Sequence, residues 1–124
     1  MRFLIVDDSG TMRRIVINSL QRLGYGDFVE AEDGSAALAR FDGSIDFVIT
    51  DWNMPRMSGL DLARAVRAHP QGATTPVLMV TTRSLRDDII AAVEAGVNNY
   101  IVKPFTPQVL KEKIDLILSA PAAR

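Results

Sequence analysis

Five short apolar runs alternate with amphipathic segments along this chain. The apolar runs are rich in Val, Ile and Phe, as in strands that a sheet buries on both faces. The predicted strands cover residues 2–6, 27–31, 46–50, 77–80 and 99–102. The segments between them carry apolar residues at helical spacing and predict helices over 10–23, 33–41, 60–68, 85–95 and 107–118. Strands that alternate with helices predict an α/β fold with a parallel sheet between two layers of helices.

Turn residues mark the ends of the first three predicted helices. Gly24 and Gly26 end the first, Asp42 to Ser44 end the second, and Pro70 follows the third. We expect the apolar face of the first helix to consist of Met12, Ile15, Val16, Ser19 and Leu23.

The chain has the length and composition of one packed domain. It has 124 residues, of which 48% are hydrophobic, with only eight Gly and six Pro. A chain of this size buries roughly two-thirds of the surface that it exposes when unfolded. We therefore expect a single domain over residues 1–124.

Charge and composition exclude several function classes. A formal net charge of −1 provides no basic field for a polyanion, so we expect no binding of nucleic acid. The absence of cysteine excludes disulfides, thiolate metal sites and a cysteine nucleophile. The first apolar run is too short for a signal peptide, and no stretch is long enough to cross a bilayer. We expect a cytoplasmic protein that does not bind membranes.

Polar side chains follow four of the predicted strands. Asp7 and Asp8 follow the first, Asp51 follows the third, Thr81 follows the fourth and Lys103 follows the fifth. The carboxyl ends of parallel strands share one edge of a sheet, and open α/β folds bind ligands at that edge. The sequence therefore predicts one pocket with three acids, a hydroxyl and an ammonium.

The adjacent Asp7 and Asp8 indicate a metal site. Like charges at a buried strand end repel one another, and a divalent cation removes that cost. Mg²⁺ binds one or two carboxylates and keeps positions for water and a phosphate. The alternative is that one of the two acids caps the helix near Gly10. A third acid, Asp51, at another strand end favours the metal.

The remaining polar residues suit phosphoryl transfer. Asp51 is the candidate nucleophile, because carboxylates form aspartyl phosphates when a metal offsets the negative charges. Lys103 can neutralise a phosphate, and its position before Pro104 makes a cis peptide bond accessible. Thr81 can donate a hydrogen bond to a phosphoryl oxygen. The only histidine, His69, lies beside a proline that ends a helix, and we assign it no role.

These residues resemble the receiver domain of bacterial two-component response regulators. The resemblance rests on Asp7-Asp8, Asp51 in TDWNMPRMSG, Thr81 and Lys103-Pro104 in YIVKPF, and it covers essentially the whole chain. It is strongest to the single-domain chemotaxis regulators of that family. It implies a flavodoxin-like doubly wound sheet of five strands in the order 2-1-3-4-5.

The resemblance also implies roles for the acidic residues. Asp51 would accept a phosphoryl group from a histidine kinase. Mg²⁺ would be held by Asp8, Asp51 and the backbone carbonyl of Asn53, and Asp7 would act on the metal mainly through water.

The same resemblance assigns the switch. Lys103 would pair with the phosphoryl oxygens, and the Lys103–Pro104 peptide bond would be cis. Thr81 would move towards the phosphoryl group, and Tyr100 would change between outward and inward rotamers.

The implied function is a phosphorylation-activated signalling switch and not an enzyme, with intrinsic autophosphorylation and autodephosphorylation chemistry. Expected partners are a chemotaxis-type histidine kinase, an output protein such as the flagellar motor switch, and a phosphatase. We expect a monomer that binds its partners through the fourth helix, fifth strand and fifth helix.

Three other functions are consistent with parts of the sequence. The domain could act as a phosphate sink or phosphorelay carrier. An aspartyl-phosphate hydrolase commonly needs a general acid two residues after the nucleophile. Asn53 occupies that position and cannot donate a dissociable proton, which disfavours the hydrolase. A flavin carrier needs a phosphate-binding loop after the first strand, where Asp7 and Asp8 would repel the phosphate.

Some positions depart from the family pattern. Thr82 replaces the usual small residue after the switch threonine, and we expect it to narrow access to the phosphoryl group. Asn53 and Arg83 flank the expected entry route and bear on the lifetime of the phosphate. Residues Ser84 to Arg86 differ from the chemotaxis regulators on the expected partner face, so they bear on the identity of the output partner.

Overall fold

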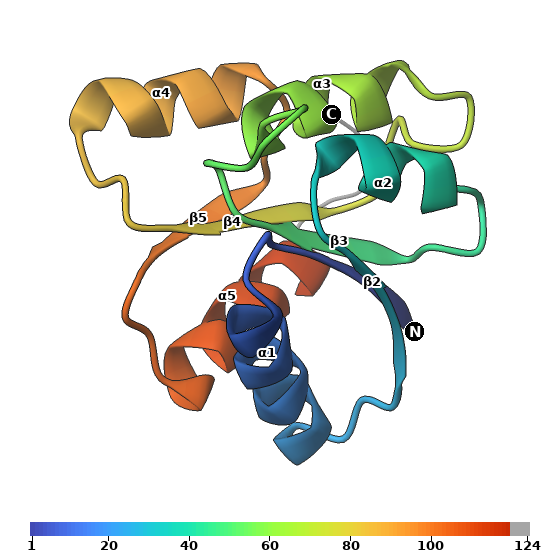
Figure 1. Cartoon of the computed structure of the whole chain (residues 1–124). Coiled ribbons are helices and arrows are strands. Elements are labelled where there is room, and N and C mark those ends of the chain that lie inside the picture. The colour runs from blue at the N-terminus through green and yellow to red at the C-terminus, as the bar shows by residue number, and fades with distance from the viewer. Residues whose placement is uncertain (120–124) are drawn as a thin grey trace.

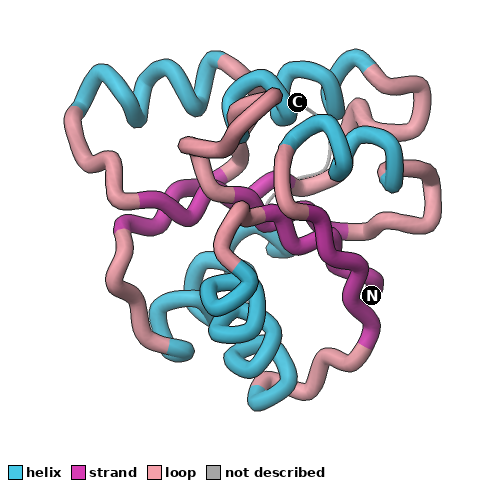
Figure 2. Tube along the Cα trace, viewed as in Figure 1, coloured by secondary structure: helices cyan, strands magenta, loops and turns pink. Residues whose placement is uncertain are grey.

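The computed structural model describes residues 1–119 and contains a five-stranded parallel sheet with helices on both faces (Figure 1). The strands are β1 (Arg2–Val6), β2 (Asp27–Ala31), β3 (Phe47–Thr50), β4 (Val77–Thr81) and β5 (Asn99–Val102). The helices are α1 (Gly10–Arg22), α2 (Gly34–Arg40), α3 (Gly59–Ala68), α4 (Arg86–Glu94) and α5 (Pro107–Ser119). Figure 2 shows the helices and strands of this trace with the loops that join them.

The sheet confirms the predicted fold class and strand order. Its strands lie in the order β2-β1-β3-β4-β5, and every pair is parallel. The predicted boundaries differ from the observed ones by one residue at several ends, where capping residues lie half inside an element. One part of the prediction for α1 was wrong: Ile15 is 44% exposed, and Leu20 is fully buried in its place. The buried face of α1 is Val16, Ser19 and Leu20.

Two hydrophobic clusters fill the space between the sheet and its helices. Helices α2, α3 and α4 cover one face, and α1 and α5 cover the other (Figure 1). The first cluster includes Leu4, Val48, Leu62 and Met79, and the second includes Ile5, Leu20 and Ile114. Side chains of one strand alternate between the two clusters, as Leu4 and Ile5 do, because successive strand residues point to opposite faces.

Strand register places the polar residues side by side. Val6 and Thr50, the last residues of β1 and β3, are paired, so Asp7 and Asp51, which directly follow them, are neighbours. Thr81 pairs with Val102, so Lys103 follows at the same edge. The alignment of the strand ends thus forms the site.

Two backbone features lie in the loops at this edge. The Lys103–Pro104 peptide bond is cis. Arg56, in the loop between β3 and α3, has a φ of 65°, in the left-handed region that favours glycine. This conformation costs a residue with a side chain about 1–2 kcal/mol, so other contacts must hold it.

Within residues 1–119, no helix combines the length and apolar character needed to span a membrane.

Candidate functional site

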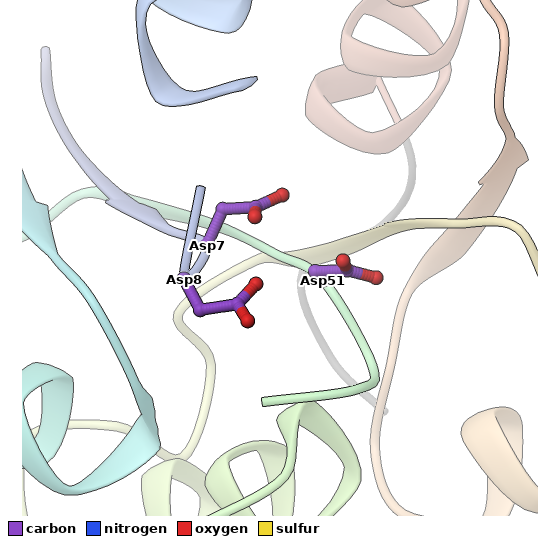
Figure 3. A group of neighbouring side chains, drawn as sticks. All are labelled: Asp7, Asp8 and Asp51. Carbon is purple, nitrogen blue, oxygen red and sulfur yellow. The ribbon is translucent and has the colours of Figure 1, made fainter. Parts of the chain in front are cut away.

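Three carboxylates gather where β1 and β3 end (Figure 3). Asp7, Asp8 and Asp51 each offer an oxygen atom, and these atoms all lie within 4.8 Å of one another. Asp7 is buried, Asp51 is half-buried and Asp8 is exposed. Carboxylate oxygens at this spacing, open to solvent on the Asp8 side, suit a hard cation such as Mg²⁺ that retains water ligands.

Asp7 is the most enclosed of the three acids. One of its carboxylate oxygens accepts a hydrogen bond from the Ser9 backbone N–H at 2.9 Å, and the other accepts one from Lys103 at 3.1 Å. Burial raises the pKa of Asp7, although Ser9 and Lys103 act in the opposite direction. The side chain that caps α1 belongs to Ser9, which accepts the Met12 N–H, so the alternative of an aspartate cap does not hold.

Asp51 is fixed at the end of β3 by its backbone and its side chain. Its N–H donates to the carbonyl of Val6 at 3.0 Å, and one carboxylate oxygen accepts the Trp52 N–H at 2.6 Å. Its other carboxylate oxygen accepts from Lys103 at 3.0 Å. The chain returns so closely that a Cβ at Gly59 would lie 1.8 Å from the Asp51 carbonyl oxygen. Any side chain would clash with the backbone of Asp51, so this close approach requires glycine at position 59.

Lys103 links the carboxylates of Asp7 and Asp51. Its ammonium lies between the Asp7 and Asp51 carboxylates, and its backbone N–H donates to the Thr81 carbonyl at 2.8 Å. Burial opposes the charge on Lys103, but the hydrogen bond and attraction from Asp51, together with those from Asp7, outweigh it and raise the pKa of Lys103. The ammonium is therefore charged at neutral pH and faces the candidate phosphoacceptor.

Thr81 and Tyr100 lie on β4 and β5 behind the site. Thr81 is fully buried, and its hydroxyl oxygen accepts the Arg83 N–H at 3.4 Å. The Tyr100 hydroxyl donates to the backbone carbonyl of Arg83 at 2.5 Å. Both residues thus contact the backbone of Arg83 in the β4–α4 loop: Thr81 binds its N–H and Tyr100 binds its carbonyl.

The Arg83 side chain bridges the β3–α3 loop and the first turn of α4. Its guanidinium donates to the Asn53 side-chain oxygen at 3.0 Å and to Asp88 at 3.3 Å, and it lies 4.7 Å from the centre of the Trp52 ring. Charged contacts and a cation–π contact together hold the β3–α3 loop against the start of α4. Exposed Thr82 lines a neighbouring groove of about 330 Å³ with Met12, Ile15, Lys103, Pro104 and Phe105.

The sequence interpretation missed two residues that support the acids. Ser9 caps α1 and binds Asp7, and a serine just before a helical segment is a signal that could have identified it. Arg13 donates to the Asp7 carbonyl at 2.6 Å and to Glu30 at 2.9 Å. No spacing rule indicated Arg13, because one partner, Asp7, follows β1 and the other, Glu30, lies on β2.

A family model for the response regulator receiver domain matches residues 3–115. The chain belongs to this family. The chemotaxis protein CheY of Pseudomonas aeruginosa is 58% identical over 118 residues, which cover 94% of this chain and 95% of the relative. The chemotaxis protein CheY1 of Helicobacter pylori is 55% identical over 120 residues, which cover 95% of this chain and 97% of the relative.

A solved structure supports the fold independently. The structure described as a CheX–CheY–BeF3–Mg complex of Borrelia burgdorferi superposes with a TM-score of 0.90. It covers 97% of this chain and 90% of that chain at 21% identity, so the likeness concerns the fold alone. The family model and the two chemotaxis relatives show that this chain is a receiver domain of the CheY chemotaxis type, a phosphorylation-dependent switch rather than a classical enzyme.

Proposed function

We propose that Asp51 is the phosphoacceptor of this receiver domain and that a histidine kinase is the donor. The observation that carries the proposal is the position of Lys103, whose ammonium lies 3.0 Å from Asp51 and 3.1 Å from Asp7. A lysine fixed beside a half-buried carboxylate supplies the charge that a bound phosphoryl group needs. A carboxylate oxygen of Asp51 attacks phosphorus, the phosphorus–nitrogen bond of the phosphohistidine breaks, and the imidazole keeps the electron pair and takes up a proton.

The acidic cluster would hold Mg²⁺ during the transfer. Receiver domains bind this ion at an acidic pocket, and the oxygens of Asp7, Asp8 and Asp51 lie close enough together to share one cation. We assign direct contacts to Asp8, Asp51 and the Asn53 carbonyl, and contact through water to Asp7. When bound, the metal offsets the negative charges that the phosphoryl group and the carboxylates bring together.

The output surface would be the face made by α4, β5 and α5. Its apolar side chains are unusually exposed: Leu85 is 71% exposed, Val93 62% and Val102 40%. Thr81 and Tyr100 connect this face to the site, because both contact Arg83 at the start of the β4–α4 loop. A phosphoryl oxygen that accepts the Thr81 hydroxyl would change this connection, and α4 would move with it.

The partners follow from the family and the site. We propose a flagellar motor switch protein as the output partner and a phosphatase that ends the signal. The Borrelia burgdorferi structure is described as a CheX–CheY–BeF3–Mg complex, which supports a partner protein for this fold.

Labelling with a small phosphodonor tests the acceptor. Acetyl phosphate with Mg²⁺ should modify Asp51, and borohydride reduction of the acyl phosphate followed by peptide mapping should locate it. Asp51→Asn should abolish the label, whereas Asp61→Asn, at an exposed position in α3, should leave it unchanged. Label on another residue, or undiminished label in Asp51→Asn, would show that the assignment is wrong.

A further inference from the structure

The loop between β3 and α3 is fixed at a point remote from the acids. Its Met57 N–H donates to the Pro55 carbonyl at 2.7 Å, which closes a three-residue turn with Arg56 at its centre. With Arg56 at a φ of 65°, this is a turn of the rare and strained kind. The same loop contains Asn53, whose carbonyl we assign to the metal. The backbone path of the loop therefore determines where this carbonyl lies.

The Arg56 side chain holds this turn against the start of α2. Its Nε donates to a carboxylate oxygen of Asp33 at 2.7 Å, its Nη2 contacts the same oxygen, and Glu32 lies 3.8 Å away. Asp33 is only 1% exposed, and its other oxygen accepts the Ala36 N–H at 2.8 Å, which caps α2. The backbone N–H of Ala36 and the Arg56 guanidinium lower the pKa of Asp33, although burial acts in the opposite direction.

A second contact lies beside this ion pair. The Gly34 N–H donates to the Met57 carbonyl at 3.1 Å, and a Cβ at Gly34 would lie 2.6 Å from that oxygen. Backbone therefore lies directly against backbone at this point. The end of the loop is attached to α2, while its beginning is attached to β1 through the Asp51 N–H, which donates to the Val6 carbonyl.

We propose that Asp33 and Arg56 form a positioning pair for the metal site. Neither residue belongs to the acidic cluster, but the pair keeps Arg56 in its disfavoured conformation and so fixes the path of the loop from Trp52 to Ser58. That path presents the Asn53 carbonyl to the site. Breaking the pair weakens binding of Mg²⁺ although every ligand is retained. This proposal rests on the proposed metal site.

Titration of Trp52 fluorescence with Mg²⁺ tests the pair, because Trp52 lies between Asp51 and Asn53. Arg56→Met removes the pairing group and keeps a side chain at the left-handed position. We expect the dissociation constant for Mg²⁺ to rise about 10-fold, as when a partner outside the ligand set is lost. Arg56→Lys restores a point charge and should recover part of the affinity.

Matched variants separate positioning from general loss of stability. Asp33→Asn keeps an oxygen for the Ala36 N–H and should weaken Mg²⁺ as Arg56→Met does, with no further loss in the double variant. Arg64→Met removes an exposed ion pair with Asp61 on α3 and should leave the affinity unchanged. The Mg²⁺ concentration that gives half-maximal labelling by acetyl phosphate should rise in Arg56→Met, whereas the rate at saturating Mg²⁺ should not change.

The outcomes distinguish this proposal from the proposed function. If the parent protein binds Mg²⁺ and Asp8→Ala weakens it, but Arg56→Met stays within about 2-fold of the parent, the positioning role is wrong and the metal site stands. The same holds if Arg64→Met weakens binding as much as Arg56→Met. If the parent binds no Mg²⁺, the metal site itself is wrong. Arg56 is mostly exposed, so Arg56→Met decides the question even if Asp33→Asn does not fold.

Discussion

Helices α4 and α5 flank the same edge strand but are held in different ways. Helix α5 begins with a side-chain cap from Thr106 and buries Leu110, Ile114 and Ile117. Helix α4 begins without a side-chain cap, and the only residue it buries fully is Ala92. A polar contact near the site, the ion pair of Arg83 with Asp88, also holds its first turn. Of these two helices, the one that we propose responds to phosphorylation is the one with fewer buried side chains.

Core truncation should show the largest difference between the two helices. Leu110→Ala removes a fully buried side chain of α5 and should lower the free energy of unfolding by about 2–5 kcal/mol. Val93→Ala on α4, at 62% exposure, should change it by about 0.5 kcal/mol or less. Urea unfolding followed by circular dichroism measures both. Equal losses would mean that α4 is packed as firmly as α5.

Loss of the Thr81 hydroxyl should disconnect α4 from the site. Thr81→Ala should still be phosphorylated on Asp51 but should gain far less affinity for a motor switch protein. A hydrogen bond to a charged group contributes about 1.5–3 kcal/mol, which corresponds to roughly 10- to 150-fold in a two-state equilibrium. Calorimetry with the stable mimic beryllofluoride measures the gain. Equal gains in parent and variant would exclude Thr81 from the switch.

The Tyr100 hydroxyl should have a smaller and more local effect. Tyr100→Phe removes the bond to the Arg83 carbonyl, which contributes about 0.5–1.5 kcal/mol. Amides of the β4–α4 loop and α4 should exchange faster with solvent, and those of α5 should not change. Tyr25→Phe, on the face covered by α1 and α5, is the matched control. Unchanged exchange in α4 would mean that this bond does not hold the loop.

The smallest effect is expected from surface charges. Asp88→Asn removes the ion pair of α4 with Arg83 and should loosen the start of α4 by less than about 1 kcal/mol. Asp115→Asn removes the Lys111 pair of α5 and should have no effect on exchange there, because the core holds that helix. The difference should disappear at high salt if it is electrostatic. Hydrogen exchange at low and high ionic strength measures it, and a loss at α5 as large as that at α4 would contradict this view.

The α/β fold class and the edge of the sheet that carries the site followed from local patterns in the sequence, whereas the strand order came from the family resemblance. Asp7, Asp51 and Lys103 could be placed together because each directly follows a strand, and parallel strands end at one edge. The burial of Leu20 in place of Ile15 could not, because both are apolar and helical spacing alone does not fix which stripe faces the sheet.

Long-range polar contacts could not be predicted from the sequence either. The contact of Arg83 with Asn53 depends on two loops meeting across 30 positions of chain. The left-handed Arg56 is opposite to what its residue type favours, and the partner that holds it, Asp33, lies on another loop. Such contacts are set by tertiary structure and leave no periodic pattern.

Hydrogen exchange with and without beryllofluoride and Mg²⁺ tests the central claim most directly. If α4 responds because its own packing is weak, the mimic should change exchange in the β4–α4 loop and α4, leave α5 unchanged, and have no effect on α4 in Thr81→Ala. A change of equal size in α4 and α5, or an unaltered response of α4 in Thr81→Ala, would contradict the account.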